Sequence, residues 1–145
     1  LDLVFGEFES FRKRSVAFLS SIKNCVWQRG AGKHFDKALF CVAMSILMMD
    51  GKNEIVCSVL EYCVRNCTCH DACFVCEYAS KVEKPSEGLI EVLLERAAHW
   101  NFYVHDPARM ALLCMNDSVV DKKLEDLLNQ PISSLSVYKP VTEGC

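Results

Sequence analysis

Residues 54–83, EIVCSVLEYCVRNCTCHDACFVCEYASKVE, lie near the middle of this 145-residue chain and decide how the rest of it is interpreted. Apolar residues recur at i, i+3 and i+4 in the first half (Val56, Val59, Leu60), which predicts an amphipathic helix. A polar break follows at residues 66–70, and Asp71 is placed to open a second helix. We therefore expect a hairpin of two helices.

The first helix of this hairpin has counterparts along the chain at a constant spacing of 34 residues. Each counterpart presents the same apolar triad, as expected of a repeated helix that buries one face. The triads are Ile22, Cys25 and Val26; Val56, Val59 and Leu60; Ile90, Leu93 and Leu94; and Leu124, Leu127 and Leu128.

The second helices recur at a spacing of 35 residues, marked by Asp36, Asp71 and Asp106. Each Asp is expected to be an N-cap, because its carboxylate can accept hydrogen bonds from first-turn amides. Two small-residue positions follow each Asp, where neighbouring helices would approach closely. They are Ala38, Cys73 and Ala108 at the first position, and Cys41, Cys76 and Ala111 at the second.

Tandem helical hairpins with this period and this placement of small residues resemble the tetratricopeptide and pentatricopeptide repeat families. The resemblance covers about residues 2–130 and implies an all-α, short solenoid of about three and a half αα-hairpins. Residues 1–130 would form this domain, beginning and ending in mid-repeat, and residues 131–145 an irregular tail. We expect the domain to belong to a larger parent chain or assembly.

The amino-acid composition and the net charge of the chain make some classes of function less favoured. Apolar residues make up 51% of the chain and the net charge is −3, which is typical of a globular domain and makes nucleic acid an unlikely partner. The first forty residues are basic, whereas residues 86–130 are rich in Glu and Asp. No apolar run reaches the roughly 20 residues that a membrane span needs. We expect an intracellular protein, cytoplasmic or nuclear, with reduced thiols.

The cysteines have two interpretations. A zinc site is the weaker one, with Cys67, Cys69, His70 and Cys73 as its ligands. The repeat favours the other, because Cys63, Cys73 and Cys76 align with alanines of neighbouring copies and are then small core residues. We therefore expect no metal and no cofactor. Cys67 and Cys69, left in a loop, would instead be exposed and reactive thiols.

No catalytic motif is present, and we expect no enzyme activity. The pairs His70-Asp71 and His105-Asp106 would suit acid–base chemistry, but their recurrence at the repeat period favours a structural role. The expected function is a scaffold or adaptor that binds a partner peptide or helix in the groove lined by the first helices. The candidate contact residues are Lys23, Trp27, Glu61, Tyr62, Glu91, Glu95 and Arg96.

Two alternatives remain open at this stage. One is RNA binding by a pentatricopeptide-like array, for which the basic run Arg12-Lys13-Arg14 and nearby aromatic residues are the only support. The other is a compact helical regulator, such as an adaptor or a viral mimic of one, in which the repeat period is coincidental.

Overall fold

The computed structural model describes residues 9–10, 13–14 and 37–130, and every regular element within them is helical, which confirms the all-α class. The helices are α2 (Lys37–Met49), α3 (Asn53–Asn66), α4 (Cys69–Ser80), α5 (Glu87–Ala97), α6 (Phe102–Cys114) and α7 (Ser118–Leu128). None of the described helices is both long and apolar enough to span a bilayer.

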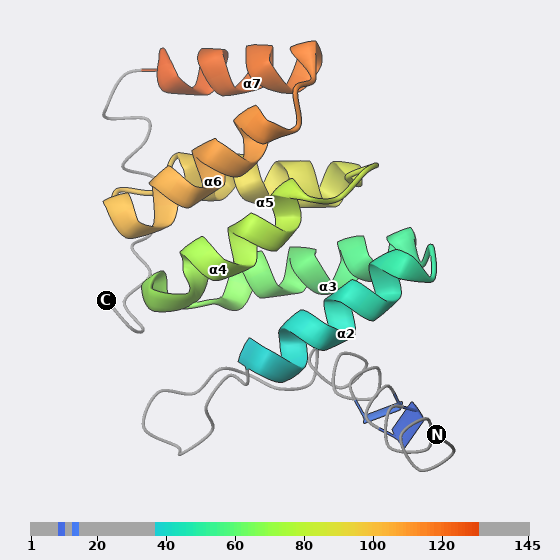
Figure 1. Ribbon diagram of the computed structural model, residues 1–145. Helices are drawn as coiled ribbons and strands as arrows, with labels where there is room; N and C mark the ends of the chain where they lie inside the picture. Colours follow the sequence, from blue (N-terminus) through green and yellow to red (C-terminus); the bar gives the residue numbers. More distant parts are fainter. Residues whose placement is uncertain (1–8, 11–12, 15–36, 131–145) are drawn as a thin grey trace.

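The helices lie in two rows (Figure 1). We call α3, α5 and α7 the odd row, in which α5 contacts both of its neighbours, and α2, α4 and α6 the even row. Within the even row α4 packs on α6, and the ring of Phe40 on α2 meets Phe74 and Tyr78 of α4 with centroids 5.7 and 5.5 Å apart. Contacts of α3 with α4, and of α5 with α6, join the two rows.

The core fills the space between the rows. Its members include four leucines that are completely buried, Leu60, Leu89, Leu93 and Leu112. They lie on the apolar faces that i, i+3, i+4 spacing creates, so burying them holds each odd helix against an even one.

The residues of the predicted apolar triads are buried in this core to different extents. Val56, Val59 and Leu60 are all buried. On α5, Leu93 is buried while Ile90 and Leu94 are partly buried against the core. On α7, Leu124 is buried, Leu127 is partly buried and Leu128 is 42% exposed. The first triad lies outside the described residues.

The small-residue positions of the second helices are only partly as predicted. Cys76, Ala108 and Ala111 are buried and Cys41 is half-buried, but Ala38 and Cys73 are exposed, so the close packing predicted at these two residues is wrong. The reason is the register of the buried faces. The face of α4 formed by Ala72, Val75 and Cys76 corresponds to Ala108, Ala111 and Leu112 of α6, a spacing of 36 residues rather than 35.

Two of the residues predicted to be N-caps, Asp71 and Asp106, are not N-caps in the structure, so these predictions are also wrong. Helix α4 begins at Cys69 after Thr68, which places Asp71 in its first turn. Helix α6 begins at Phe102, where the Asn101 side chain accepts a hydrogen bond from the Tyr103 amide at 2.9 Å. Asn101 is as good a cap as Asp and comes first in the chain, so Asp106 and Pro107 become interior residues. Asp36 lies outside the described residues.

The ends of the other helices follow from local chemistry. Gly51 ends α2 with a φ of +70°, a left-handed conformation that glycine adopts without a Cβ clash. Ser86 caps α5 by accepting from the Leu89 amide at 3.2 Å. Asp117, rather than Ser118, caps α7 by accepting from the amides of Val119 and Val120.

The Phe40 contact provides a test of the packing between α2 and α4. Replacing the fully buried Phe40 with Ala should lower the free energy of unfolding by roughly 3–5 kcal/mol, because a large cavity opens beneath Phe74 and Tyr78. Urea unfolding followed by circular dichroism measures this change.

Met49→Ala on the same helix is the matched control, because this side chain is 86% exposed. Its effect should stay within about 0.5 kcal/mol. Equal effects of the two substitutions would contradict the packing described for α2.

Candidate functional site

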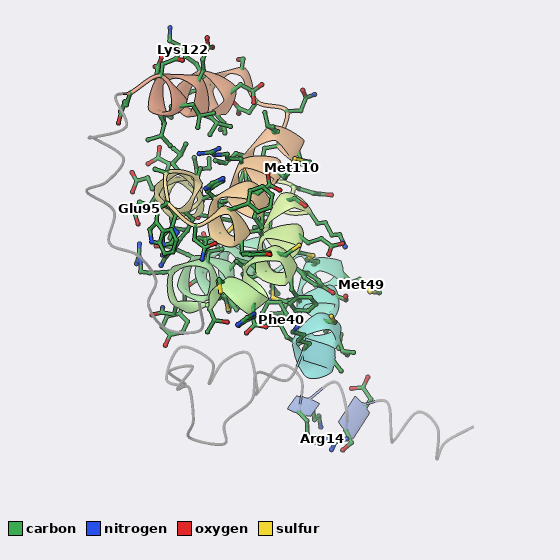
Figure 2. The ribbon with its side chains drawn as sticks, turned by 90° about the vertical axis from the view of Figure 1, so that its left-hand side faces the viewer. Arg14, Phe40, Met49, Glu95, Met110 and Lys122 are labelled. Atoms are coloured by element: carbon green, nitrogen blue, oxygen red, sulfur yellow. The ribbon has the colours of Figure 1, made fainter. Side chains whose placement is uncertain are left out.

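The odd-row surface carries most of the contact residues predicted from the sequence. Glu91 and Glu95 are exposed on α5, whereas Glu61 and Tyr62 of α3 are half-buried. Because α3 and α5 are in contact, these residues belong to one continuous surface. Figure 2 shows Glu95 on one side of the molecule and Met49, of the even row, on the other. Lys23 and Trp27 lie outside the described residues.

Glu61 is held against the start of α5 rather than free in solvent. A Cβ added to Gly88 would lie 2.6 Å from Glu61 Oε2, so the carboxylate occupies the space that this glycine leaves and would have to turn aside for a larger residue. Gly88 is in the first turn of α5, where the partial positive charge of the helix end favours an anion. Glu61 therefore places its charge at the start of α5.

Arg96, also a predicted contact residue, is bonded within the molecule. It is half-buried, its Nε donates to the Val64 carbonyl at 3.2 Å, and its Nη2 donates to the Arg65 carbonyl. These are carbonyls of the last turn of α3, which lack helical donors. Arg109 of α6 does the same for α5, with Nε donating to the Ala97 carbonyl at 2.9 Å.

Acidic side chains line the exposed face of α5, and Glu87 among them lies in the first turn of this helix. Glu87, Glu91 and Glu95 are exposed at successive i, i+4 positions, so they form a row along one face of α5. Like charges at this spacing destabilise a helix by about 0.2–0.5 kcal/mol a pair. Asp106 is a further exposed carboxylate, on α6, and its charge acts on Arg109.

An exposed aromatic turn joins α5 to α6. Trp100, Phe102 and Tyr103 are 60%, 60% and 69% exposed. Phe102 packs edge-on against Tyr103 and against His105, with centroids 5.9 and 5.6 Å apart. Neighbouring exposed apolar side chains on a soluble protein mark binding surfaces more often than isolated ones do. We call Trp100, Phe102 and Tyr103 the aromatic turn.

His99 holds the backbone of the aromatic turn from its buried side. Its side chain is buried and stacks on Trp100, and its Nδ1 accepts a hydrogen bond from the Asn101 amide at 3.0 Å. The Nδ1 atom of His105 lies 2.8 Å from the His99 carbonyl. Burial, with the nearby Arg96 charge as a second cause, lowers the pKa of His99. The neutral imidazole is therefore the form that holds the turn.

Sequence reasoning did not find the aromatic turn. The available signal was the density of aromatic and His residues in residues 99–105, HWNFYVH, at a helix junction. The repeat register drew attention to Trp27 and Tyr62 instead, because they fall on the outward positions of first helices.

Two cysteines, Cys67 and Cys69, were expected to be exposed and reactive thiols in a loop, and the structure places them differently. Cys67 and Cys69 are each only 7% exposed, so their assignment as exposed thiols is wrong. Helix α4 starts at Cys69 and turns both side chains inward. Cys69 is disulfide-bonded, so the expectation of reduced thiols is wrong for this residue. Free thiols among the described residues are those of Cys41, Cys57, Cys63, Cys67, Cys73, Cys76 and Cys114.

Burial also determines the chemistry of these thiols. It raises the pKa of Cys67 to about 12, although the Arg96 charge partly opposes this shift. Burial likewise raises the pKa of Cys63 and of Cys76, and the neighbouring Cys67 adds to both shifts. Within the part of the chain that the structure describes, no group of three or more His, Cys, Asp or Glu side chains is placed to hold a metal ion.

A cavity of about 320 Å³ lies at the other end of α5, between the α2–α3 turn and the α4–α5 linker. Met48, Val56 and Val82 form its apolar wall, and Asn53 Nδ2 closes one side by donating to the Lys84 carbonyl at 2.8 Å. Its charged lining, Lys81, Glu83 and Lys84, is solvent-exposed. Charged side chains that are exposed in this way do not define a specific ligand geometry.

Comparison with protein-family models, with curated proteins and with solved structures finds no significant match to this chain. The aromatic turn and the acidic row of α5 must therefore be interpreted through their own chemistry.

Thiol accessibility gives a direct test of the cysteine assignments. In the native protein at pH 8, iodoacetamide should modify the exposed Cys73 and Cys114 well before the buried Cys63, Cys67 and Cys76. The buried thiols are shielded and their raised pKa values leave little thiolate to react. Mass spectrometry of peptides after timed alkylation measures the order. Early modification of Cys67 would contradict its burial, and alkylation in guanidinium is the control.

The His99 contact predicts a pH dependence of stability. In the unfolded chain His99 titrates near its usual pKa of about 6.5, and in the folded chain at lower pH. Between these two pKa values the unfolded state binds more protons, so the free energy of unfolding should fall as pH falls. Above the higher value the contribution is fully present. Urea unfolding from about pH 7 to 5 measures the slope.

His99→Gln should flatten this slope, because Gln keeps an acceptor but does not titrate. His70→Gln is the control, since His70 is exposed, and should leave the slope unchanged. If both variants retain the wild-type slope, His99 is not its source.

Proposed function

We propose that this chain is a non-catalytic protein-interaction module, built as a short helical-repeat solenoid of the tetratricopeptide-like kind. The alternation of contacts supports the proposal, because each odd helix packs on the next odd helix and on an even neighbour. Such a stack buries a continuous core and leaves one side of each row open. In Figure 1, α2 and α7 lie at opposite ends of the stack, which argues against a closed regulatory bundle.

The observation that carries the proposal is the exposure of the aromatic turn. Trp and Tyr dominate the binding energy of protein interfaces, because each supplies a large apolar area at low cost in side-chain entropy. The turn is also held in place by the buried His99 and by the Asn101 cap. Its rings are therefore presented on a fixed backbone, which lowers the entropy lost on binding.

The partner would lie along the outer side of α5 and end on the aromatic turn. Glu91 and Glu95 border this path, and Tyr62 lies on the neighbouring α3. RNA is the less supported partner. Aromatic rings can stack on bases, but the carboxylates of α5 would repel a phosphate backbone.

Selection from a display library of random 12-residue peptides tests this function. Wild-type protein should enrich a peptide family, and the double variant Trp100→Ala, Tyr103→Ala should bind those peptides at least about tenfold more weakly. Both side chains are more than half exposed, so their removal should leave the circular dichroism spectrum and the melting temperature nearly unchanged.

The matched control is Ile55→Ala, Val119→Ala, which removes apolar side chains that are 48% and 61% exposed on α3 and α7. This variant should bind the selected peptides as the wild type does. Peptides that bind the aromatic-turn variant with unchanged affinity would overturn the proposal.

A further inference from the structure

We propose that the partner recognised at the aromatic turn is a basic peptide segment, whose Lys and Arg side chains contact the aromatic rings and the carboxylates of α5. This inference rests on the proposed interaction function and adds the chemistry of the partner. Exposed rings and a row of exposed acids, two independent features of the same hairpin, both favour a cation.

The first feature is a charge imbalance produced by the fold. Arg96 and Arg109 are the two basic residues between Glu87 and Asp117. Both direct their Nε to helix carbonyls and are half-buried. The exposed charges on α5 are those of Glu87, Glu91 and Glu95, whereas the exposed Asp106 of α6 interacts with Arg109. A basic partner would relieve the repulsion along α5, whereas an acidic partner would increase it.

The second feature is the exposure of the rings of the aromatic turn, which is 60–69% although His99 stacks on Trp100. Elsewhere this protein places its own cations on rings, with Lys37 Nζ 5.7 Å from the Phe74 centroid and Lys81 Nζ 5.1 Å from the Tyr78 centroid. Among the described residues, no Lys or Arg lies over Trp100, Phe102 or Tyr103. Trp and Tyr are good acceptors for ammonium and guanidinium groups, worth about 0.5–2 kcal/mol each.

The spacing of the acids indicates the form of the peptide. Glu87, Glu91 and Glu95 follow one another at four-residue intervals, which corresponds to about 6 Å along the helix axis. Alternate side chains of an extended peptide are separated by about 6.5–7 Å. An extended segment with a basic residue at every second position therefore matches the row and leads onto the aromatic turn.

The test uses the full chain and three fluorescein-labelled 12-residue peptides of the same length. Their alternate positions carry Arg or Lys in the first, Gln in the second and Glu in the third. Fluorescence anisotropy should show the basic peptide binding at least about tenfold more tightly than the other two, and more weakly as salt is raised.

Two double variants locate the contact. Trp100→Ala, Tyr103→Ala and Glu91→Lys, Glu95→Lys should each weaken the basic peptide by about tenfold or more. The control Glu125→Lys, Asp126→Lys makes the same change in net charge on the exposed face of α7 and should weaken it by less than about threefold.

The outcomes separate this inference from the function on which it rests. If the Gln or Glu peptide binds as tightly as the basic one and still depends on Trp100 and Tyr103, the basic-partner inference is wrong while the interaction function stands. If the α7 control weakens binding as much as the α5 variant does, the attraction is non-specific and the inference is again wrong. If the aromatic-turn variant changes neither these peptides nor the selected ones, both proposals fail.

Discussion

The hydrogen bonds by which Arg96 and Arg109 cover the last carbonyls of α3 and α5 tie each of these helices to the one that packs on it. Each bond joins the C-terminal end of one helix to a later helix, so it completes the first helix and adds to the packing that holds the second. The same bonds withdraw the only basic side chains from the outer surface between Glu87 and Asp117. A structural requirement thus produces the acidic character of α5, and the partner chemistry proposed for this surface depends on it.

The helical class could be predicted from the sequence because the chain repeats apolar triads at i, i+3 and i+4, such as Val56, Val59 and Leu60. Only a helix places residues with this spacing on one face, where they can be buried together. Helix starts were predicted less well. Asp71 and Asp106 have the right side chain for a cap, but Thr68 and Asn101 precede them and begin the helices earlier. Which residue becomes the N-cap depends on the other capping residues nearby and on tertiary contacts. Neither of these can be inferred from a repeat period of 35 residues.

The site was predicted in part. Glu91 and Glu95 do lie on an exposed helix face, but the sequence could not show that Glu61 would rest on Gly88 or that Arg96 would turn back to α3. Both depend on contacts between residues roughly 30 positions apart. The aromatic turn was missed for a different reason. Aligning the repeats with one another draws attention to positions that recur. Trp100 and Tyr103 occur at one helix junction and have no counterparts in the other repeats. Their exposure follows from the folded structure and cannot be seen in the sequence.

The fit of Glu61 onto Gly88 makes the charge of one helix depend on the size of a residue on the next. A side chain at position 88 would meet the Glu61 carboxylate at the first turn of α5, and this flexible carboxylate would turn aside. Its charge would then leave the partly positive end of α5 for solvent. A substitution on α5 would therefore redirect an acid that α3 carries.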